Sequence, residues 1–204
     1  AIELFDAYIA MLKDKKGHIR GEMLGGRLNY TARNVIVPDP TLALNQIDLS
    51  YNTFLKVFEY KIIAYLMTIE NITLSKAYEI WCKATEFDER VYKIMNYIIE
   101  TEDTRCLINR NPTLNFYSML LMKIRRIEPS ADVYSMSVPL EILPGLNADF
   151  DGDILNIVGM MDDSLSYMFR KFDPVKRMII SRDTGYINTL FAPTKGQKID
   201  LHYL

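Results

Sequence analysis

Strand-like patterns lie on both sides of a long helical stretch, and this order constrains the fold more than any other feature of the sequence. From Ile19 to Val37 the pattern is strand-like, with Gly25-Gly26 as a turn signal. Apolar residues recur at helical spacing between about Leu49 and Thr104, and short segments return after Arg105. We therefore expect the two β parts to meet in space and share one core, with the helices packed outside it as an insertion.

A run of alternating acids leads into a strand-like segment at 154–158. The run reads Asn147-Ala-Asp-Phe-Asp-Gly-Asp153, and its acids are Asp149, Asp151 and Asp153. In an extended or tightly looped backbone, side chains two residues apart point the same way, so we expect the carboxylates to converge. Phe150 then points the opposite way and anchors the loop, while Gly152 permits the bend around an ion.

Three carboxylates this close repel one another, and a hard dication is their natural neutraliser. All-oxygen ligands favour Mg²⁺ or Mn²⁺ over zinc. A calcium-binding EF-hand loop also begins with alternating acids, but it requires Gly at position six and Glu at position twelve. Counted from Asp149, those positions hold Ile154 and Met160. The run therefore predicts a magnesium-like site, and the alternative is an acidic surface turn without an ion.

Charge is unevenly distributed in a chain whose net charge of -2 gives no overall signature of nucleic-acid binding. Between residues 13 and 33, six basic residues stand against two acidic ones, a net charge of +4 with His18 neutral. A basic arm and an acidic loop in one chain are typical of a protein that meets polyanions at one place and cations at another. A solvated charged face is the alternative.

Two further classes of protein are disfavoured by the sequence. Cys82 and Cys106 lie outside any CxxC or histidine-rich spacing, so we expect neither a zinc site nor a disulfide framework. No apolar run approaches the ~20 residues that span a bilayer, and no cationic and apolar leader is present. We therefore expect no membrane association, and an intracellular protein or a fragment of one.

The acidic run resembles the metal-binding heptapeptide of the largest (beta-prime-like) subunit of multisubunit DNA-dependent RNA polymerases. Asn109-Arg110-Asn111-Pro112-Thr113-Leu114 is similar to the family's Asn-Arg-Ala-Pro-Thr-Leu turn. The segment from Gly25 to Ile36 is similar to the family's Gly-Lys-Arg-Val-Asp-Tyr-Ser-Gly-Arg-Ser-Val-Ile, and a basic stretch at Lys16–Arg20 precedes it. With Pro139-Leu140 before the acidic run, the resemblance covers nearly the whole chain.

The resemblance implies an α+β fold in which a double-psi β-barrel carries the metal loop and a helical insertion separates its two halves. Together with helical spacing in residues 2–13, a short helix around Ser164–Phe172 and a β-like stretch at 178–181, this gives the expected parts of the chain. They are an N-terminal helix (1–14), a basic segment with the first part of the barrel (15–46), the helical insertion (47–104), the second part of the barrel with the metal loop (105–160), and a C-terminal helix and β segment (161–204).

The resemblance also implies a catalytic centre for nucleotidyl transfer. Asp149, Asp151 and Asp153 would be the catalytic residues and would bind the first Mg²⁺, while a second ion arrives with the nucleoside triphosphate. Arg110 and Asn147 match positions that read the ribose hydroxyls of the incoming nucleotide. The residues alone leave open a surface turn for Arg110 and loop capping for Asn147.

The basic segment matches one that contacts the template strand and the RNA:DNA hybrid, without reading sequence. Its matching positions are Arg20, Arg27 and Arg33. For these three, solvated cations are the alternative.

The implied partners are a second large (beta-like) subunit, the remainder of the largest subunit, the DNA template, the nascent RNA and nucleoside triphosphates. The chain alone is expected to bind Mg²⁺ weakly and to make no RNA, and its expected location is the cytoplasm of a bacterial host or virus-infected cell, associated with DNA. Departures from the family's pattern, such as Gly26 for lysine and Asn111 for alanine, favour a divergent member from a phage or virus.

Two other functions stay open at this point. One is an RNA-templated RNA polymerase with a related Asp-x-Asp-Gly-Asp loop, and the other is a barrel module that binds without catalysing.

Overall fold

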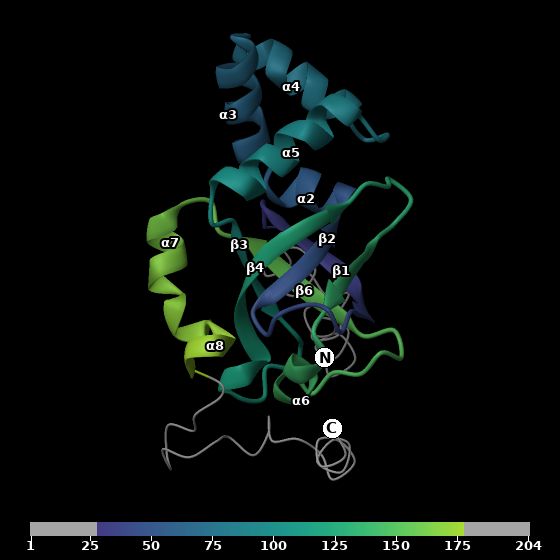
Figure 1. Cartoon of the computed structure of the whole chain (residues 1–204), viewed down its shortest axis with the longest axis vertical. Helices are drawn as coiled ribbons and strands as arrows, with labels where there is room; N and C mark the ends of the chain where they lie inside the picture. Colours follow the sequence, from purple (N-terminus) through teal and green to yellow (C-terminus); the bar gives the residue numbers. More distant parts are fainter. Residues whose placement is uncertain (1–27, 178–204) are drawn as a thin grey trace, which may run out of the picture.

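The computed structural model describes residues 28–177, and a closed barrel of six strands forms its centre (Figure 1). The strands are β1 (Thr31–Pro38), β2 (Gln46–Ser50), β3 (Arg105–Asn109), β4 (Met119–Glu128), β5 (Ser135–Val138) and β6 (Ile154–Gly159). Around the barrel they follow the order β1-β5-β2-β4-β3-β6. β1 pairs with β5 and β2 with β4 in parallel, and the other neighbours are antiparallel. This barrel confirms the predicted double-psi β-barrel in an α+β fold.

Four helices lie between β2 and β3 and cover one end of the barrel, at the top of Figure 1. They are α2 (Tyr51–Val57), α3 (Glu59–Glu70), α4 (Leu74–Lys83) and α5 (Glu89–Thr101). One buried cluster runs from Ile108 and Leu155 of the barrel to Phe54 and Met95 of the helices and to Phe58, which lies between α2 and α3. Since fully burying such a side chain contributes about 1.5–3 kcal/mol, this shared core holds the helices on the barrel. The helical insertion between the two halves of the barrel is thereby confirmed.

The helices of the insertion begin later than the sequence suggests. The prediction places the start of the insertion at residue 47 and the start of the helical spacing at about Leu49. In the structure the side chains of Ile47 and Leu49 are buried within β2, which pairs in parallel with β4. Helix α2 begins at Tyr51, after Ser50, whose hydroxyl oxygen accepts a hydrogen bond from the backbone N–H of Thr53 at 3.4 Å.

Two other helices of the insertion start with different caps. The side chain of Asp88 accepts hydrogen bonds from the backbone N–H groups of Arg90 and Val91 at the start of α5. Thr73 precedes α4 without a side-chain cap hydrogen bond. Capping by a side chain therefore stabilises α5 and not α4.

Shorter elements complete the described part of the chain. They are η2 (Phe116–Ser118), η3 (Leu140–Ile142), α6 (Leu143–Leu146), α7 (Asp163–Met168), η4 (Arg170–Phe172) and α8 (Pro174–Arg177). Leu165, Phe169 and Phe172 pack over a small second cluster on the outside of the barrel, around Leu107 and Leu121. Within residues 28–177, none of the helices has the length and apolar character needed to cross a membrane.

A half-buried ion network joins β2 to β4. Asp48 is 3% exposed. Its Oδ1 accepts a hydrogen bond from Nε of Arg125 at 3.0 Å, and its Oδ2 lies 3.2 Å from Nη2 of Arg126. Because Asp48 lies between two cations, its charge is compensated despite its burial.

The predicted N-terminal helix at 1–14, the basic residues Arg20 and Arg27, and the β segment expected after residue 177 lie outside the described residues.

Candidate metal centre

The acidic loop, residues 147–153, joins the end of α6 to the start of β6. Two contacts fix the loop to the barrel. The half-buried side chain of Phe150 packs against the main core, and the carbonyl oxygen of Asp153 accepts a hydrogen bond from the Ile36 N–H of β1 at 3.1 Å. Gly152 has φ +107°, which residues with a side chain rarely adopt. The anchoring by Phe150 is thus confirmed, and Gly152 has the backbone conformation that a bend there requires; that the loop bends around an ion stays a prediction.

Asp153 is held by three hydrogen-bond donors. Its Oδ2 accepts from Nε of Arg110 at 2.9 Å and from the backbone N–H of Asp149 at 3.0 Å, and its Oδ1 accepts from Nη2 of Arg110 at 3.0 Å. The side chains of this bidentate pair are 20% and 21% exposed. The hydrogen bond from Arg110 is the main cause that lowers the pKa of Asp153, and the backbone N–H of Asp149 lowers it further. Asp153 is therefore an anion held by a cation from another part of the chain.

Asp149 and Asp151 are exposed, and Oδ1 of Asp149 accepts a hydrogen bond from the Phe150 N–H at 2.8 Å. Among residues 28–177, no three His, Cys, Asp or Glu side chains form a group that could hold a metal ion. The structure thus differs from the convergence that the spacing predicts. Residues 150–152 form a turn, where alternation of side chains along an extended backbone does not apply, and Asp153 is turned to Arg110.

The chemistry of the loop nevertheless fits a hard dication. All three acids offer only carboxylate oxygens, which are the ligands that Mg²⁺ prefers. Asp149 and Asp151 are exposed, so rotation about their own side-chain bonds can turn them toward an ion. A carboxylate has about four acceptor positions, and the three donors around Asp153 leave it about one.

The turn between β3 and β4 presents Arg110 to the acidic loop. Asn109 Nδ2 donates to Thr113 Oγ1 across this turn at 3.0 Å, and the Asn111–Pro112 peptide bond is cis. The backbone N–H of Arg110 donates to the carbonyl oxygen of Ser118 at 3.3 Å. Arg110 and Asp153 are 43 residues apart in sequence, and no spacing rule signals their ion pair.

Asn147 ends helix α6 in the left-handed conformation, with φ 49° and ψ 46°. Its backbone N–H donates to the carbonyl oxygens of Leu143 and Pro144. Its backbone therefore caps the helix, and its predicted contact with a ribose hydroxyl stays a prediction. Asn147 is exposed and stands two residues before Asp149 in the loop.

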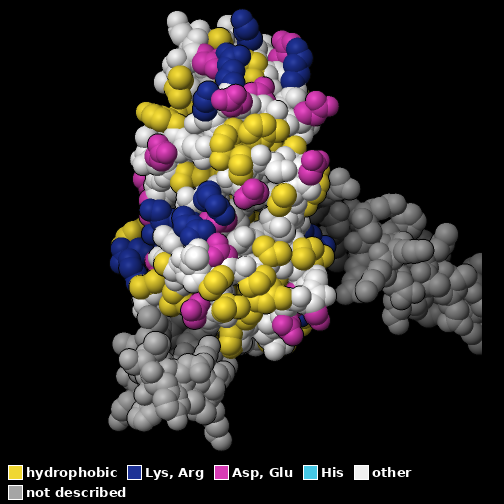
Figure 2. Space-filling model, turned by 45° about the vertical axis from the view of Figure 1, so that its right-hand side comes forward, with side chains coloured by type: hydrophobic (Ala, Val, Ile, Leu, Met, Phe, Trp, Pro, Cys, Tyr) yellow, Lys and Arg dark blue, Asp and Glu magenta, His cyan; other side chains and the backbone are white. Residues whose placement is uncertain are grey.

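Arg33 is exposed on β1, on the strand that runs beside the acidic loop. It stands opposite Asn156 of β6, and Val35 of β1 stands opposite Ile154, the residue after Asp153. On the face seen in Figure 2, basic and acidic side chains are interspersed rather than gathered in one basic surface. The register places Arg33 near the strand that follows the loop.

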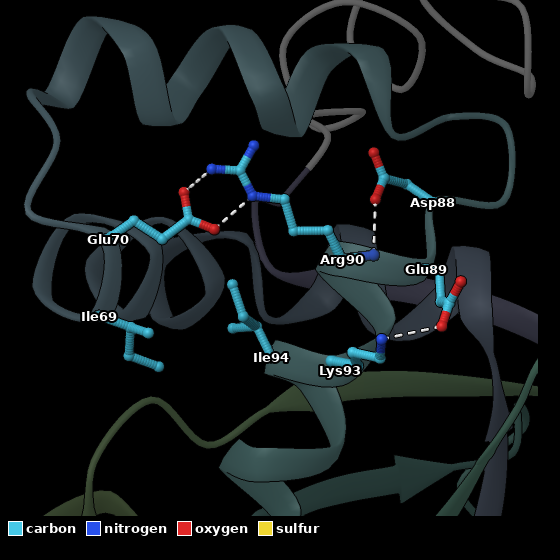
Figure 3. Close-up of a pocket in the computed structure, with 7 residues that line it drawn as sticks. All are labelled: Ile69, Glu70, Asp88, Glu89, Arg90, Lys93 and Ile94. Carbon is cyan, nitrogen blue, oxygen red and sulfur yellow. Dashed lines mark hydrogen bonds and ion pairs between the residues drawn. The ribbon is translucent and has the colours of Figure 1, made fainter.

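A hollow of about 500 Å³ lies between the end of α3 and the start of α5 (Figure 3). Only residues of the insertion line it, among them Arg90 and Glu70, which form an ion pair. None of the predicted site residues contributes to it.

No family model matches the chain. Curated relatives do match, and their names read DNA-directed RNA polymerase subunit beta'. One from Endomicrobium trichonymphae is 36% identical over 144 residues, which are 70% of this chain and 8% of the relative. One from Rhodopirellula baltica is 34% identical over 191 residues, 93% of this chain and 12% of the relative. One from Dichelobacter nodosus is 28% identical over 196 residues, 95% of this chain and 13% of the relative. The chain thus spans about a tenth of the length of these relatives.

Proposed function

The chain is a homologue of a segment of the DNA-directed RNA polymerase beta' subunit, and on this premise we propose that it forms the magnesium-binding catalytic part of such an enzyme. The observation that carries the proposal is the acidic loop of Asp149, Asp151 and Asp153, displayed from a double-psi β-barrel with Arg110 bound to it. The reaction is nucleotidyl transfer from a nucleoside triphosphate to the RNA 3′ end.

The three acids would hold the first Mg²⁺ in this reaction. When bound, this ion and a second one that arrives with the nucleotide would activate the RNA 3′-hydroxyl and stabilise the leaving pyrophosphate. Phe150 and the Ile36 contact of Asp153 keep the loop fixed to the barrel, which limits the reorganisation needed at the moment of reaction.

Arg110 and Asn147 would bind the ribose hydroxyls of the incoming nucleotide. Arg110 reaches the loop itself, and Asn147 is an exposed residue of the same loop. A site that hydrogen-bonds a hydroxyl discriminates against substrates without it, because the protein group is then left unpaired. Arg33, together with Arg20 and Arg27, would contact nucleic-acid phosphates without reading sequence.

The proposed partners are the remainder of the largest subunit, a second large subunit, the DNA template and the nascent RNA. The chain alone is then expected to make no RNA.

Iron-directed cleavage tests the metal site directly. With Fe²⁺ in place of Mg²⁺, hydroxyl radicals should cut the backbone near residues 149–153. Asp151→Ala should abolish these cuts, and Asp132→Ala, which removes an exposed acid from the loop between β4 and β5, should leave them unchanged. Cuts that persist in Asp151→Ala, or none in the unmodified chain, would refute the proposed metal site.

The template is tested separately, with the full assembly. RNA made on DNA templates supports the proposal. RNA made on RNA templates alone would identify an RNA-templated polymerase instead, and no product on either template, with the metal cuts absent, would identify a non-catalytic barrel module.

A further inference from the structure

The charge balance of the acidic loop is set by a residue outside it. Asp149, Asp151 and Asp153 bring three negative charges, and Arg110 brings a positive charge into direct contact with one of them. The side chains of Arg110 and Asp153 are each only about one-fifth exposed, so water screens their interaction less than that of an ordinary surface ion pair. The loop is thus partly neutralised by the protein itself.

The geometry of the pair determines which atoms remain available. Arg110 covers both oxygens of Asp153, at 2.9 Å and 3.0 Å, and the Asp149 N–H takes a further position on Oδ2 at 3.0 Å. An ion that takes Asp153 as a ligand therefore meets a carboxylate whose oxygens already accept from a guanidinium. About one acceptor position on Oδ1 remains open, but a cation bound there would lie beside the guanidinium, so the two like charges compete for the same carboxylate.

We propose that Arg110 is an internal counter-cation of the acidic loop and competes with a divalent ion for Asp153. The inference rests on the proposed function, since it takes the three acids as the ligands of that ion. It adds a role for Arg110 beyond the ribose contact. Arg110 holds Asp153 before the ion arrives and withdraws at least one of its hydrogen bonds when the ion binds.

The competition between Arg110 and the ion for Asp153 links metal binding to nucleotide recognition. The guanidinium has five N–H donors in a rigid fork, and the pair with Asp153 uses the edge formed by Nε and Nη2. When the ion takes over Asp153, that edge becomes available to another acceptor, such as a substrate hydroxyl. Arg110 is therefore expected to bind substrate better in the metal-loaded chain.

Manganese titration followed by electron paramagnetic resonance tests the competition on the full chain without any activity measurement. Arg110→Gln should bind Mn²⁺ at least tenfold more tightly, because removing one positive charge about 4 Å from a dication changes the affinity by more than tenfold even at the dielectric constant of water. Arg110→Lys keeps the charge without the two-point contact and should fall between Arg110→Gln and the unmodified chain. Arg90→Gln removes an arginine from an ion pair on the insertion and should leave the Mn²⁺ affinity unchanged.

Asp151→Asn separates failure of this inference from failure of the proposed function. It should weaken Mn²⁺ binding at least tenfold, because it removes a proposed ligand and no contact of Arg110. If Asp151→Asn binds Mn²⁺ as well as the unmodified chain, the proposed metal site is wrong. If Asp151→Asn weakens binding but Arg110→Gln binds equally or less tightly than the unmodified chain, the site stands and the counter-cation role is wrong.

A measurement on the unmodified chain covers the case in which Arg110→Gln does not fold. The Nε–H resonance of Arg110 should shift when Mg²⁺ is added to saturation, since its partner is drawn to the ion. The Arg90 resonance should stay in place and serves as the internal control. An unmoved Arg110 resonance in the Mg²⁺-loaded chain would overturn the proposal.

Discussion

Replacing Gly159 by alanine should destabilise the protein, because this glycine lies where the insertion meets the barrel. An added Cβ would come within 2.5 Å of Met161 Cε, 2.7 Å of Val57 Cγ1 and 3.1 Å of the Val57 carbonyl oxygen. Carbon atoms in favourable contact are about 3.5–4.0 Å apart. Met161 can turn its flexible end away, but Val57 belongs to helix α2 and is fully buried.

Two opposing effects set the size of the stability loss in Gly159→Ala. Forcing an extra methyl into a packed core costs about 1–3 kcal/mol. Replacing glycine by alanine reduces the conformational entropy of the unfolded chain, which restores about 0.4–1 kcal/mol. We therefore expect the free energy of unfolding to fall by about 1–2 kcal/mol.

A double-mutant cycle in urea measures this crowding. Val57→Ala alone should also destabilise, because it leaves a cavity in the core. If the two methyls collide, the combined variant should lose less than the sum of the single losses, by about 0.5 kcal/mol or more. Strictly additive losses, or a Gly159→Ala variant as stable as the unmodified chain, would refute the reasoning.

Three other substitution or labelling experiments test the described packing. Cys82 is exposed, whereas burial raises the pKa of the Cys106 thiol to about 12. A thiol reagent at about pH 8 should therefore label Cys82 quickly and Cys106 only after unfolding, and equal labelling rates would contradict the burial of Cys106. Asp48→Asn should lower the free energy of unfolding by about 2–3 kcal/mol in urea, because the buried side chain loses the charge that holds its hydrogen bonds from Arg125 and its ion pair with Arg126. An unchanged midpoint would count against the network. Asp88→Ala should lower the free energy of unfolding by about 1 kcal/mol in the same assay, and Thr73→Ala should lower it much less, because of these two residues only Asp88 caps its helix with a side chain. Equal losses of stability would show that the two caps do not differ.

Local patterns in the sequence were sufficient for the order of β and helical parts and for the choice of the acidic loop, whereas the resemblance supplied the double-psi β-barrel and the other candidate residues. Helical spacing between about Leu49 and Thr104 located the insertion, because that pattern depends on residues three and four apart. The acidic run, Phe150 and Gly152 were identified in the same way. Their anchoring and bending are consequences of backbone geometry over a few residues, and the structure agrees with both.

Local patterns failed where a residue's partner lies far away in the chain. Residues 47–50 were assigned to the helical insertion, and their pairing with the distant strands β4 and β5 makes them part of a strand. The order of the strands in the closed barrel likewise depends on contacts between segments far apart in the sequence, and the periodicity of apolar residues does not predict such contacts.

The same limit applies to the candidate site. The sequence by itself determined that three carboxylates stand together in one loop, and the resemblance placed Arg110 in the same centre. Only the tertiary structure decided that Asp153 is bound by Arg110 from 43 residues away, while Asp149 and Asp151 remain exposed. The physical reason is that side-chain direction in a turn and the choice of ion-pair partner depend on which strands lie next to each other, and β3 and β6 become neighbours only when the barrel closes.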